Sequence, residues 1–285
     1  MDKWFRNSLL VLILLTLFFT GCNLYSEPTP EGTLKVHFID VGQGDSILIQ
    51  EKDYVMLIDG GDRSAGEKVA QYLKELGIQR INTVVGTHPH ADHIGGLIQV
   101  LENFTVDEVI DPGVIHTTKT FEDYLTIIDQ KNIKFTEGRA GMRVDVKNGF
   151  YFKILHPSNP SSRELNNASI VIKLVYGDIN FLFTGDIERE AELEILDSVS
   201  RQTLKSQVLK VAHHGSSTST TREFLQMVSP QIGIIMVGEG NRYGHPHEET
   251  LDLLREKNIT VYRTDLHGTI IITTDGNTYS LKTEK

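Results

Sequence analysis

Short hydrophobic runs alternate with amphipathic segments from residue 33 to the end of the chain. Aliphatic and β-branched side chains dominate the runs, which is typical of buried strands. In the first third, the predicted strands are residues 34–39, 46–49, 55–58 and 83–85. Residues 66–76 instead place their apolar side chains on one face at helical spacing. This part of the chain therefore mixes strands and helices.

The remainder of the chain repeats this alternation. The further predicted strands are residues 150–155, 169–175, 180–183, 208–211, 232–237, 269–274 and 278–282. The further predicted helices are residues 92–101, 188–196, 221–227 and 248–257. Strands predominate and helices lie between them, so we predict an α/β (α+β) fold with two facing sheets and helices outside, a four-layer αββα sandwich. No linker interrupts residues 33–285, which we therefore expect to form one domain.

The start of the chain has a different pattern. Lys3 and Arg6 precede an apolar run from Leu9 to Phe19, which ends at Thr20-Gly21-Cys22. A basic start, a short apolar run and a small residue before a cleavage site are typical of a secretory signal. The run is also shorter than the roughly twenty residues that a spanning helix requires. We expect residues 1–22 to be a lipoprotein-type signal peptide that ends at a lipidated Cys22; the alternative is an uncleaved anchor with an incidental cysteine.

A lipidated Cys22 would place the protein outside the cytoplasm, anchored to the cell membrane of a bacterium. Residues 23–32, rich in proline, serine and threonine, would be a spacer. Cys22 is the only cysteine, so disulfides and cysteine catalysis are not expected in the mature chain. Nothing in the sequence indicates an obligate protein partner.

The charge of the chain limits the ways in which it could bind an anionic substrate. The formal net charge is −10, and removal of residues 1–21 would make it −11. A protein with this charge does not bind polyanions through general electrostatics. A phosphate group would have to be held locally, by metals or by a few basic side chains. Lys210, Arg242 and Arg263 are candidates, although surface solvation explains a lone basic residue equally well.

Four potential metal ligands lie within six residues, directly after the predicted strand 83–85. The segment reads His88-Pro89-His90-Ala91-Asp92-His93. Two imidazoles two residues apart can point to the same side of an extended segment. A helix that begins near Asp92 would turn Asp92 and His93 toward a neighbouring point. These ligand types suit zinc, manganese or iron better than magnesium or calcium. An incidental polar loop does not explain three histidines and an aspartate together.

Two more strand ends carry potential ligands. The predicted strand 180–183 is followed by Thr184-Gly185-Asp186, and a carboxylate there could bridge two cations. A helix N-cap would explain Asp186 equally well. The predicted strand 208–211 is followed by His213 and His214, of which one could be a ligand and the other could orient a ligand or face substrate.

Taken together, these motifs resemble the metallo-β-lactamase superfamily and, within it, the extracytoplasmic hydrolase domain of the ComEC family of competence proteins. The Asp40-Val41-Gly42-Gln43-Gly44-Asp45 segment and His213-His214-Gly215-Ser216 carry the likeness to ComEC. The matching segments are residues 38–46, 57–61, 88–96, 166–169, 184–186, 213–216 and 243–246. They occur in order over nearly all of residues 33–285.

The resemblance implies a hydrolase with two divalent metal ions, zinc or manganese, in its active site. His88 and His90 would hold the first metal and Asp92 and His93 the second, with Asp186 bridging them. Asp92 is therefore expected to be both a ligand and essential for catalysis.

The resemblance also implies roles for the two histidines after the predicted strand 208–211 and for the segment that precedes Asp186. His214 would be a terminal ligand, and His213 would orient a ligand or contact substrate. Many superfamily members have another histidine before the bridging aspartate, whereas this chain has Asn166 and Asn167, with His156 further back. The first site could therefore lack one protein ligand, which a water could replace.

Further candidates surround the expected ligands. The loop residue His245 is a candidate proton donor or substrate contact, although it could instead cap a helix locally. Asp59 follows an apolar strand and is expected to orient metal ligands. Asp40 and Asp45 could do the same, but turn chemistry with the neighbouring glycines explains them at least as well.

The expected activity is phosphodiester hydrolysis outside the membrane. The resemblance suggests DNA as the substrate, with single-stranded DNA as a candidate. A choline-phosphate or other cell-wall phosphodiester is the close alternative, and β-lactam hydrolysis fits less well. A function of another class is a non-catalytic, metal-bound lipoprotein that binds DNA during uptake. ComEC itself has many membrane spans and this chain has one signal-like segment, so we do not expect a DNA channel.

Overall fold

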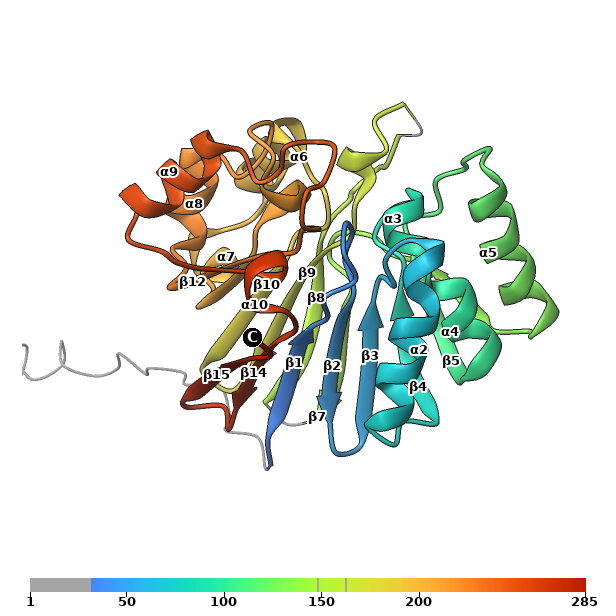
Figure 1. Cartoon of the computed structure of the whole chain (residues 1–285). Helices are drawn as coiled ribbons and strands as arrows, with labels where there is room; N and C mark the ends of the chain where they lie inside the picture. Colours follow the sequence, from blue (N-terminus) through green and yellow to red (C-terminus); the bar gives the residue numbers. More distant parts are fainter. Residues whose placement is uncertain (1–31, 148, 162) are drawn as a thin grey trace, which may run out of the picture.

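A computed structural model of the chain describes residues 32–147, 149–161 and 163–285 (Figure 1). The expected signal peptide, Cys22 and nearly all of the expected spacer lie outside the described residues, so these expectations stay predictions. Within the described ranges, no helix has both the length and the apolar character that crossing a bilayer requires.

Two sheets form the centre of the structure. The first has eight strands in the order β15-β14-β1-β2-β3-β4-β5-β6, and β3 to β6 are mutually parallel. Its strands are β1 (Leu34–Phe38), β2 (Ile47–Glu51), β3 (Tyr54–Ile58), β4 (Arg80–Val85), β5 (Thr105–Asp111), β6 (Lys134–Glu137), β14 (Ile270–Thr274) and β15 (Tyr279–Thr283). The antiparallel strands β1, β2, β14 and β15 complete it on the other side.

The second sheet has seven strands in the order β13-β12-β11-β10-β9-β8-β7. They are β7 (Arg143–Lys147), β8 (Phe150–His156), β9 (Val171–Tyr176), β10 (Ile179–Phe183), β11 (Val208–Lys210), β12 (Ile232–Ile235) and β13 (Thr260–Arg263). Strands β10 to β13 are mutually parallel, and β7 to β9 are antiparallel to their neighbours.

Three hydrophobic cores separate four layers. The central core joins the inner faces of both sheets and contains Phe38, Phe152 and Phe181, all fully buried. A second core packs the outer face of the first sheet against α2 (Gly66–Glu75), α4 (Leu97–Asn103) and α5 (Lys119–Gln130). A third packs the second sheet against α6 (Arg189–Ser198), α7 (Arg201–Leu204), α8 (Arg222–Val228) and α9 (Glu248–Glu256). Figure 1 shows the two helical layers on opposite sides of the sheets. The predicted αββα sandwich is confirmed.

The predicted helix 92–101 is wrong in one respect, because it is divided into α3 (Ala91–Ile94) and α4. The division lies at Gly95-Gly96. The amide of Gly96 donates to Gly61 O at 2.9 Å instead of continuing the helix, and a Cβ on Gly96 would lie 1.9 Å from Gly60 O. The glycines therefore let α3 pack directly on the loop after β3.

The elements that were not predicted are β5, α5, β6, β7, α7, β13 and α10 (Thr264–His267). In α5 the pattern was present, since the buried Phe121, Tyr124 and Ile128 recur at helical spacing. In others the hydrophobic pattern is weak. Strand β6 is an example, since it lies at the edge of the first sheet and three of its four residues are exposed. An exposed edge strand buries little apolar surface and so leaves little pattern in the sequence.

Candidate metal centre

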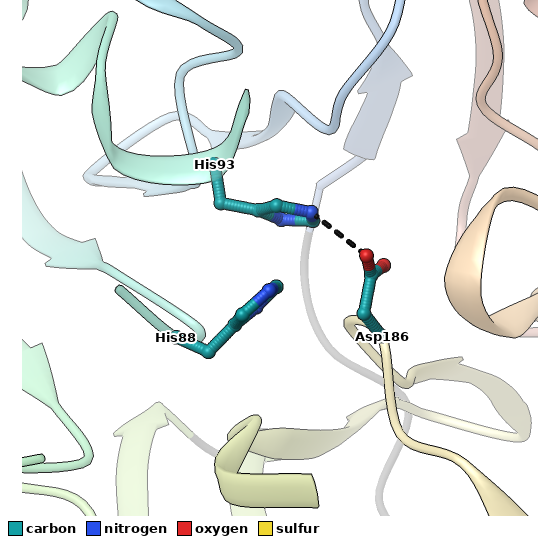
Figure 2. Close-up of side chains that lie close together, drawn as sticks. All are labelled: His88, His93 and Asp186. Atoms are coloured by element: carbon teal, nitrogen blue, oxygen red, sulfur yellow. Dashed lines mark hydrogen bonds and ion pairs between the residues drawn. The ribbon is translucent and has the colours of Figure 1, made fainter. Parts of the chain in front are cut away.

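Asp59 and His93 form the best-ordered part of the centre. Asp59 follows β3 with φ +57° and is fully buried. Its carboxylate accepts from Thr87 N (2.8 Å) and from the Thr87 hydroxyl (2.7 Å), and His93 Nδ1 lies 2.8 Å from Asp59 Oδ2. A proton on His93 Nδ1 satisfies this contact, so Nε2 is the ring atom available for a metal or, without one, for a second proton. That atom points toward Asp186 Oδ2 at 3.2 Å (Figure 2).

His88 and His90 follow the end of β4 and lie against each other. His88 is fully buried, and its Nε2 lies 2.9 Å from His90 Nδ1. The Thr87 hydroxyl lies 3.2 Å from His88 Nδ1 and donates to Asp59, so it can accept the His88 Nδ1 proton. Burial, together with the charge of His93, lowers the pKa of both rings and favours the neutral form, which is the form that binds metals.

Asp186 lies between imidazoles from the two sheets. It follows β10, and its amide donates to the Ser169 hydroxyl at 3.1 Å. Its Oδ2 is 3.2 Å from His93 Nε2 and 3.2 Å from His214 Nε2. Burial alone would raise the pKa of Asp186, but His214, His93 and Lys210 outweigh it and hold that pKa well below its usual value. Asp186 is therefore a carboxylate placed to bridge two positive centres.

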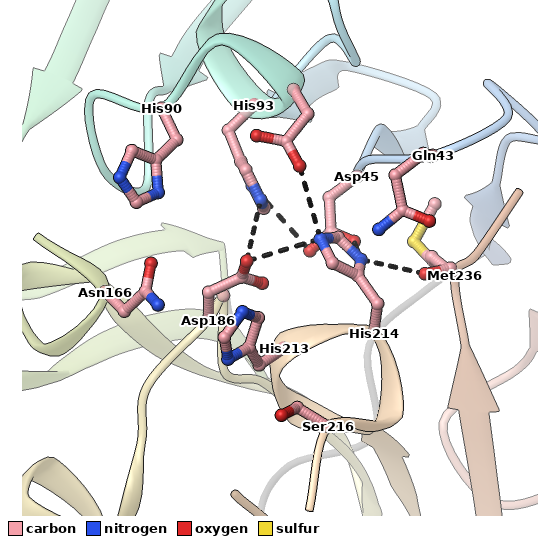
Figure 3. Close-up of polar contacts among 12 residues, drawn as sticks. Gln43, Asp45, His90, His93, Asn166, Asp186, His213, His214, Ser216 and Met236 are labelled. Carbon is pink, nitrogen blue, oxygen red and sulfur yellow. Dashed lines mark hydrogen bonds and ion pairs between the residues drawn. The ribbon is translucent and has the colours of Figure 1, made fainter. Parts of the chain in front are cut away.

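The two consecutive histidines after β11 adopt an uncommon backbone conformation. His213 and His214 have φ values of +49° and +54°, and such left-handed residues often mark functional sites. His214 Nδ1 donates to Met236 O at 2.9 Å, so Nε2 is the ring atom available for a metal or, without one, for a second proton. This Nε2 faces Asp186 Oδ2 at 3.2 Å (Figure 3). It also lies 3.6 Å from Asp92 Oδ2.

The donor set fits metal ions on its chemistry. His214 Nε2 faces two carboxylates, an arrangement that requires a positive charge there, either a second ring proton or a metal ion. Among the described residues, three groups have donor atoms that all lie within 4.8 Å of one another, namely His88, His93 and Asp186; Asp92, His93 and His214; and Asp45, Asp59 and His93. Although burial favours neutral rings, Asp186 outweighs it and raises the pKa of His93 and His214 well above the usual value. The centre therefore favours positive charge, which divalent cations would supply.

Two carboxylates, those of Asp45 and Asp186, lie beside the buried side chain of Lys210 behind the centre. Lys210 is fully buried, donates to Gly185 O at 2.8 Å and pairs with Asp45 at 2.5 Å and Asp186 at 3.4 Å. Burial opposes the charge, but the two carboxylates outweigh it and raise the pKa of Lys210. Lys210 therefore neutralises buried carboxylates, and the hypothesis that it holds phosphate is wrong.

Two other candidates lie apart from the centre. Asp40 accepts from Gly42 N at 3.2 Å, and its own amide donates to the Thr269 hydroxyl, which is the turn chemistry expected as its alternative. Arg263 pairs with Asp265 at 2.6 Å and does not line the pocket above the metal ligands. Neither residue is placed to contact the ligands or a substrate.

A pocket of about 800 Å³ opens above the ligands. Asp92, His90, Asn166, Arg242 and His245 all line it, so five candidates from distant parts of the sequence meet there. Burial, with the charges of neighbouring histidines, lowers the pKa of His245 to about 4, so its ring is neutral near pH 7. Its Nδ1 is buried without a hydrogen-bond partner among the described residues.

Sequence reasoning missed three residues of this region. Glu188 Oε1 lies 3.2 Å from His213 Nδ1 and accepts from the Thr218 hydroxyl, so it orients the histidine that does not face Asp92. Thr87 connects Asp59 to both His88 and His93. His116 lines the pocket from the loop between β5 and α5, a region whose pattern predicted no element. Of these three residues, only Thr87 could have been found from the sequence, because it directly precedes the histidine cluster.

Comparison with known proteins agrees with this architecture. The sequence model of the metallo-β-lactamase superfamily matches residues 39–239. The chain is 32% identical over 265 residues to ComE operon protein 3 of Bacillus subtilis, covering 87% of this chain and 34% of that protein. It is 29% identical to Competence protein ComA of Neisseria gonorrhoeae, covering 86% of this chain and 33% of that protein. The chain thus spans about a third of the length of these relatives.

The alignment with a solved structure also supports the fold. The metallo-β-lactamase fold protein YhfI from Bacillus subtilis aligns with a TM-score of 0.53 at 13% identity, covering 87% of this chain and all of that one (100%). Identity this low shows the fold and not the activity. The resemblance to ComEC-family competence proteins rests on the curated relatives and is confirmed. This chain belongs to the metallo-β-lactamase superfamily.

Proposed function

We propose that this chain is a phosphodiesterase that uses two divalent metal ions. Superfamily membership indicates a metal-dependent hydrolase. The observation that carries the proposal is the position of Asp186 Oδ2, 3.2 Å from an imidazole nitrogen on each side. A carboxylate in that position suits a centre in which one group bridges two cations.

The ligands divide between two sites. His88 and His90 would hold the first metal, and Asp92, His93 and His214 the second, with Asp186 shared. His214 is favoured over His213 as the ligand because His213 is turned toward Glu188. Zinc and manganese both suit these nitrogen and oxygen donors.

The chemistry follows from this arrangement. When bound, the cations supply Lewis acidity and lower the pKa of a shared water toward neutrality. Asp59 fixes the His93 ring through Nδ1, and Met236 O fixes His214 in the same way, so both donor atoms are preorganised. His245 lies in the pocket with a free ring nitrogen and would contact a phosphate oxygen or the leaving group.

The substrate we favour is a nucleic-acid phosphodiester, with single-stranded DNA first. The relation to competence proteins supports this choice. The net charge of −10 favours a substrate held at the metals over long duplex DNA held along a basic surface. A choline-phosphate or other cell-wall phosphodiester is the alternative that the same site could accept.

The test is a side-by-side assay of metal-reconstituted protein. Bis-p-nitrophenyl phosphate, single-stranded DNA, p-nitrophenyl phosphorylcholine and nitrocefin would be the substrates. We expect turnover of the first two, and a loss of about a thousandfold or more in Asp92→Ala, because a ligand and its several kcal/mol of transition-state stabilisation are removed. Asp40→Ala, which removes a turn contact with Gly42 and an ion pair with Lys68 but no contact with the proposed ligands, is the matched control.

Two other outcomes would refute this proposal. Turnover of p-nitrophenyl phosphorylcholine alone would identify the cell-wall alternative. If Asp92→Ala keeps wild-type DNA binding and the wild-type cellular phenotype, the protein is a metal-bound binding module.

We also propose that the protein lies outside the cytoplasm, anchored through Cys22. The relation to competence proteins supports a membrane-associated or extracytoplasmic role. Radiolabelled palmitate should enter the wild type and not Cys22→Ser. Equal labelling of both would show that Cys22 is not the acylated residue.

A further inference from the structure

Asn166 presents an unused oxygen to the metal pocket. It lies in the 3₁₀ turn η2 (Asn166–Ala168), and it lines the same pocket as His90 and Asp186. Its Oδ1 is buried and has no hydrogen-bond partner among the described residues. A buried carbonyl oxygen without a partner costs about 1–3 kcal/mol, so it calls for an explanation.

The orientation of the Asn166 amide follows from its neighbour Glu188. The amide nitrogen Nδ2 lies 3.4 Å from Glu188 Oε1, and this oxygen also accepts from the Thr218 hydroxyl at 3.1 Å. An ionised carboxylate can only accept hydrogen bonds, so the NH₂ end must face Glu188 and the oxygen must face away from it. In Figure 3 that oxygen points toward His90.

The adjacent asparagine has a different environment. Asn167 Oδ1 accepts from Glu188 N at 2.8 Å, and its nitrogen faces Glu190 Oε2 at 3.4 Å. Its oxygen is therefore already used by the backbone. Of the two asparagines, only Asn166 has an oxygen available to the centre.

We propose that Asn166 Oδ1 is the third protein ligand of the first metal, beside His88 and His90. This inference rests on the proposed two-metal centre. The first site would then combine two imidazoles with an amide oxygen and Asp186, whereas three imidazoles would make a softer site. Oxygen donors shift preference from zinc toward manganese. The first site would then have two nitrogen and two oxygen donors, and it should bind manganese better relative to zinc than a site with three imidazoles would.

The test measures metal binding without turnover. Apo protein would be titrated with Mn²⁺ and with Zn²⁺ against a competing chelator, and bound Mn²⁺ would be followed by electron paramagnetic resonance. In Asn166→Ala, one of the two Mn²⁺ equivalents should weaken at least tenfold, because a ligand is lost. Asn166→His should shift the ratio of zinc to manganese affinity at that site at least tenfold toward zinc. Asn166→Asp, which keeps an oxygen, should retain two equivalents of Mn²⁺.

Asn167→Ala is the matched control and should bind both metals as the wild type does. Thermal unfolding of the apo proteins would show that each variant is folded. Wild-type Mn²⁺ affinities in folded Asn166→Ala would overturn the inference, and so would equal weakening in Asn167→Ala. Two tight metals in the wild type without hydrolysis of bis-p-nitrophenyl phosphate would instead refute the proposed function and leave the ligand assignment intact.

Discussion

Single buried carboxylates fix the direction of the metal ligands at the residue scale. Asp59 contacts no substrate-facing surface, yet it holds both the Thr87 backbone and the His93 ring. Strand β3 ends one residue before Asp59, and the positive φ of Asp59 turns its side chain toward the histidines. The role expected for Asp59 from its place after an apolar strand agrees with these contacts.

Asp59→Asn should weaken metal binding by about 10- to 100-fold. The new amide can present its NH₂ to His93 Nδ1, which would move the ring proton to Nε2 and occupy the donor atom that faces Asp186. Competition titration with a chelator measures the change. Asp40→Asn serves as the control and should leave the affinity unchanged. Wild-type affinity in folded Asp59→Asn would show that the ring is oriented by other contacts.

Close packing of loops decides the position of the centre at the scale of elements. Gly44, in the loop between β1 and β2, has φ +128°, and a Cβ there would lie 2.2 Å from Asp92 O. The next residue, Asp45, donates its amide to the same oxygen at 3.3 Å. The loop that follows β1 therefore supports the start of α3, which carries Asp92 and His93.

Gly44→Ala should lower both the melting temperature and the metal content, because the added methyl group pushes α3 and Asp92 away. Gly42→Ala is a matched control, since Gly42 also has positive φ (+75°) but has nothing within 4 Å of its Cβ position. That control should lose only about 1–2 kcal/mol of stability from the backbone and keep its metals. Calorimetry and elemental analysis give both quantities. Equal loss of metal in the two variants would argue against a specific contact with Asp92.

A buried lysine gives β9 a pH-dependent contribution to stability. Burial, with a smaller effect of Lys153, lowers the pKa of Lys173 from 10.5 to about 7. Between about pH 7 and pH 10.5, Lys173 is protonated in the unfolded chain and neutral in the folded one. The free energy of unfolding should therefore rise with pH by up to roughly 1.4 kcal/mol per pH unit. Below about pH 7 both states are protonated and this contribution no longer changes.

Urea unfolding at pH 7, 8 and 9 measures this effect. The rise of the free energy of unfolding with pH should be smaller in Lys173→Met than in the wild type. It should be unchanged in Lys52→Met, a substitution on the exposed surface. Parallel slopes for wild type and Lys173→Met would show that Lys173 remains charged in the folded protein.

For the whole molecule, the proposed function predicts that an anionic strand is held at the metal centre and not along the surface. The chain carries 38 acidic and 28 basic residues, so its net charge repels polyanions. Chelation and removal of the metals should therefore weaken binding of a phosphorothioate single-stranded oligonucleotide at least tenfold at 0.15 M salt. Fluorescence anisotropy measures the affinity, and resupplied metal should restore it. Unchanged binding by the apo protein would mean that a basic patch of the surface holds the strand.

Much of this protein follows from the local sequence. The inner strands of the sheets, such as β9, β11 and β12, show aliphatic runs because their side chains are buried on both faces. The hydrophobic period predicts α2, α6, α8 and α9. The His88–His93 cluster is also local, since six residues at a strand end cannot separate far. Weakly patterned elements such as β6 could not be predicted, because they bury little apolar surface.

The sequence by itself therefore determined the order of the strongly patterned elements, the layered fold and the cluster that supplies most of the proposed ligands. Only the tertiary structure decided that Lys210 is buried against Asp45, that Glu188 orients both His213 and Asn166, and that His214 faces Asp92. The physical reason is that these contacts join residues far apart in the chain. Short spacing along the chain keeps the six residues from His88 to His93 close together in any fold. The partner of a buried charge, in contrast, is fixed only when the two sheets pack together.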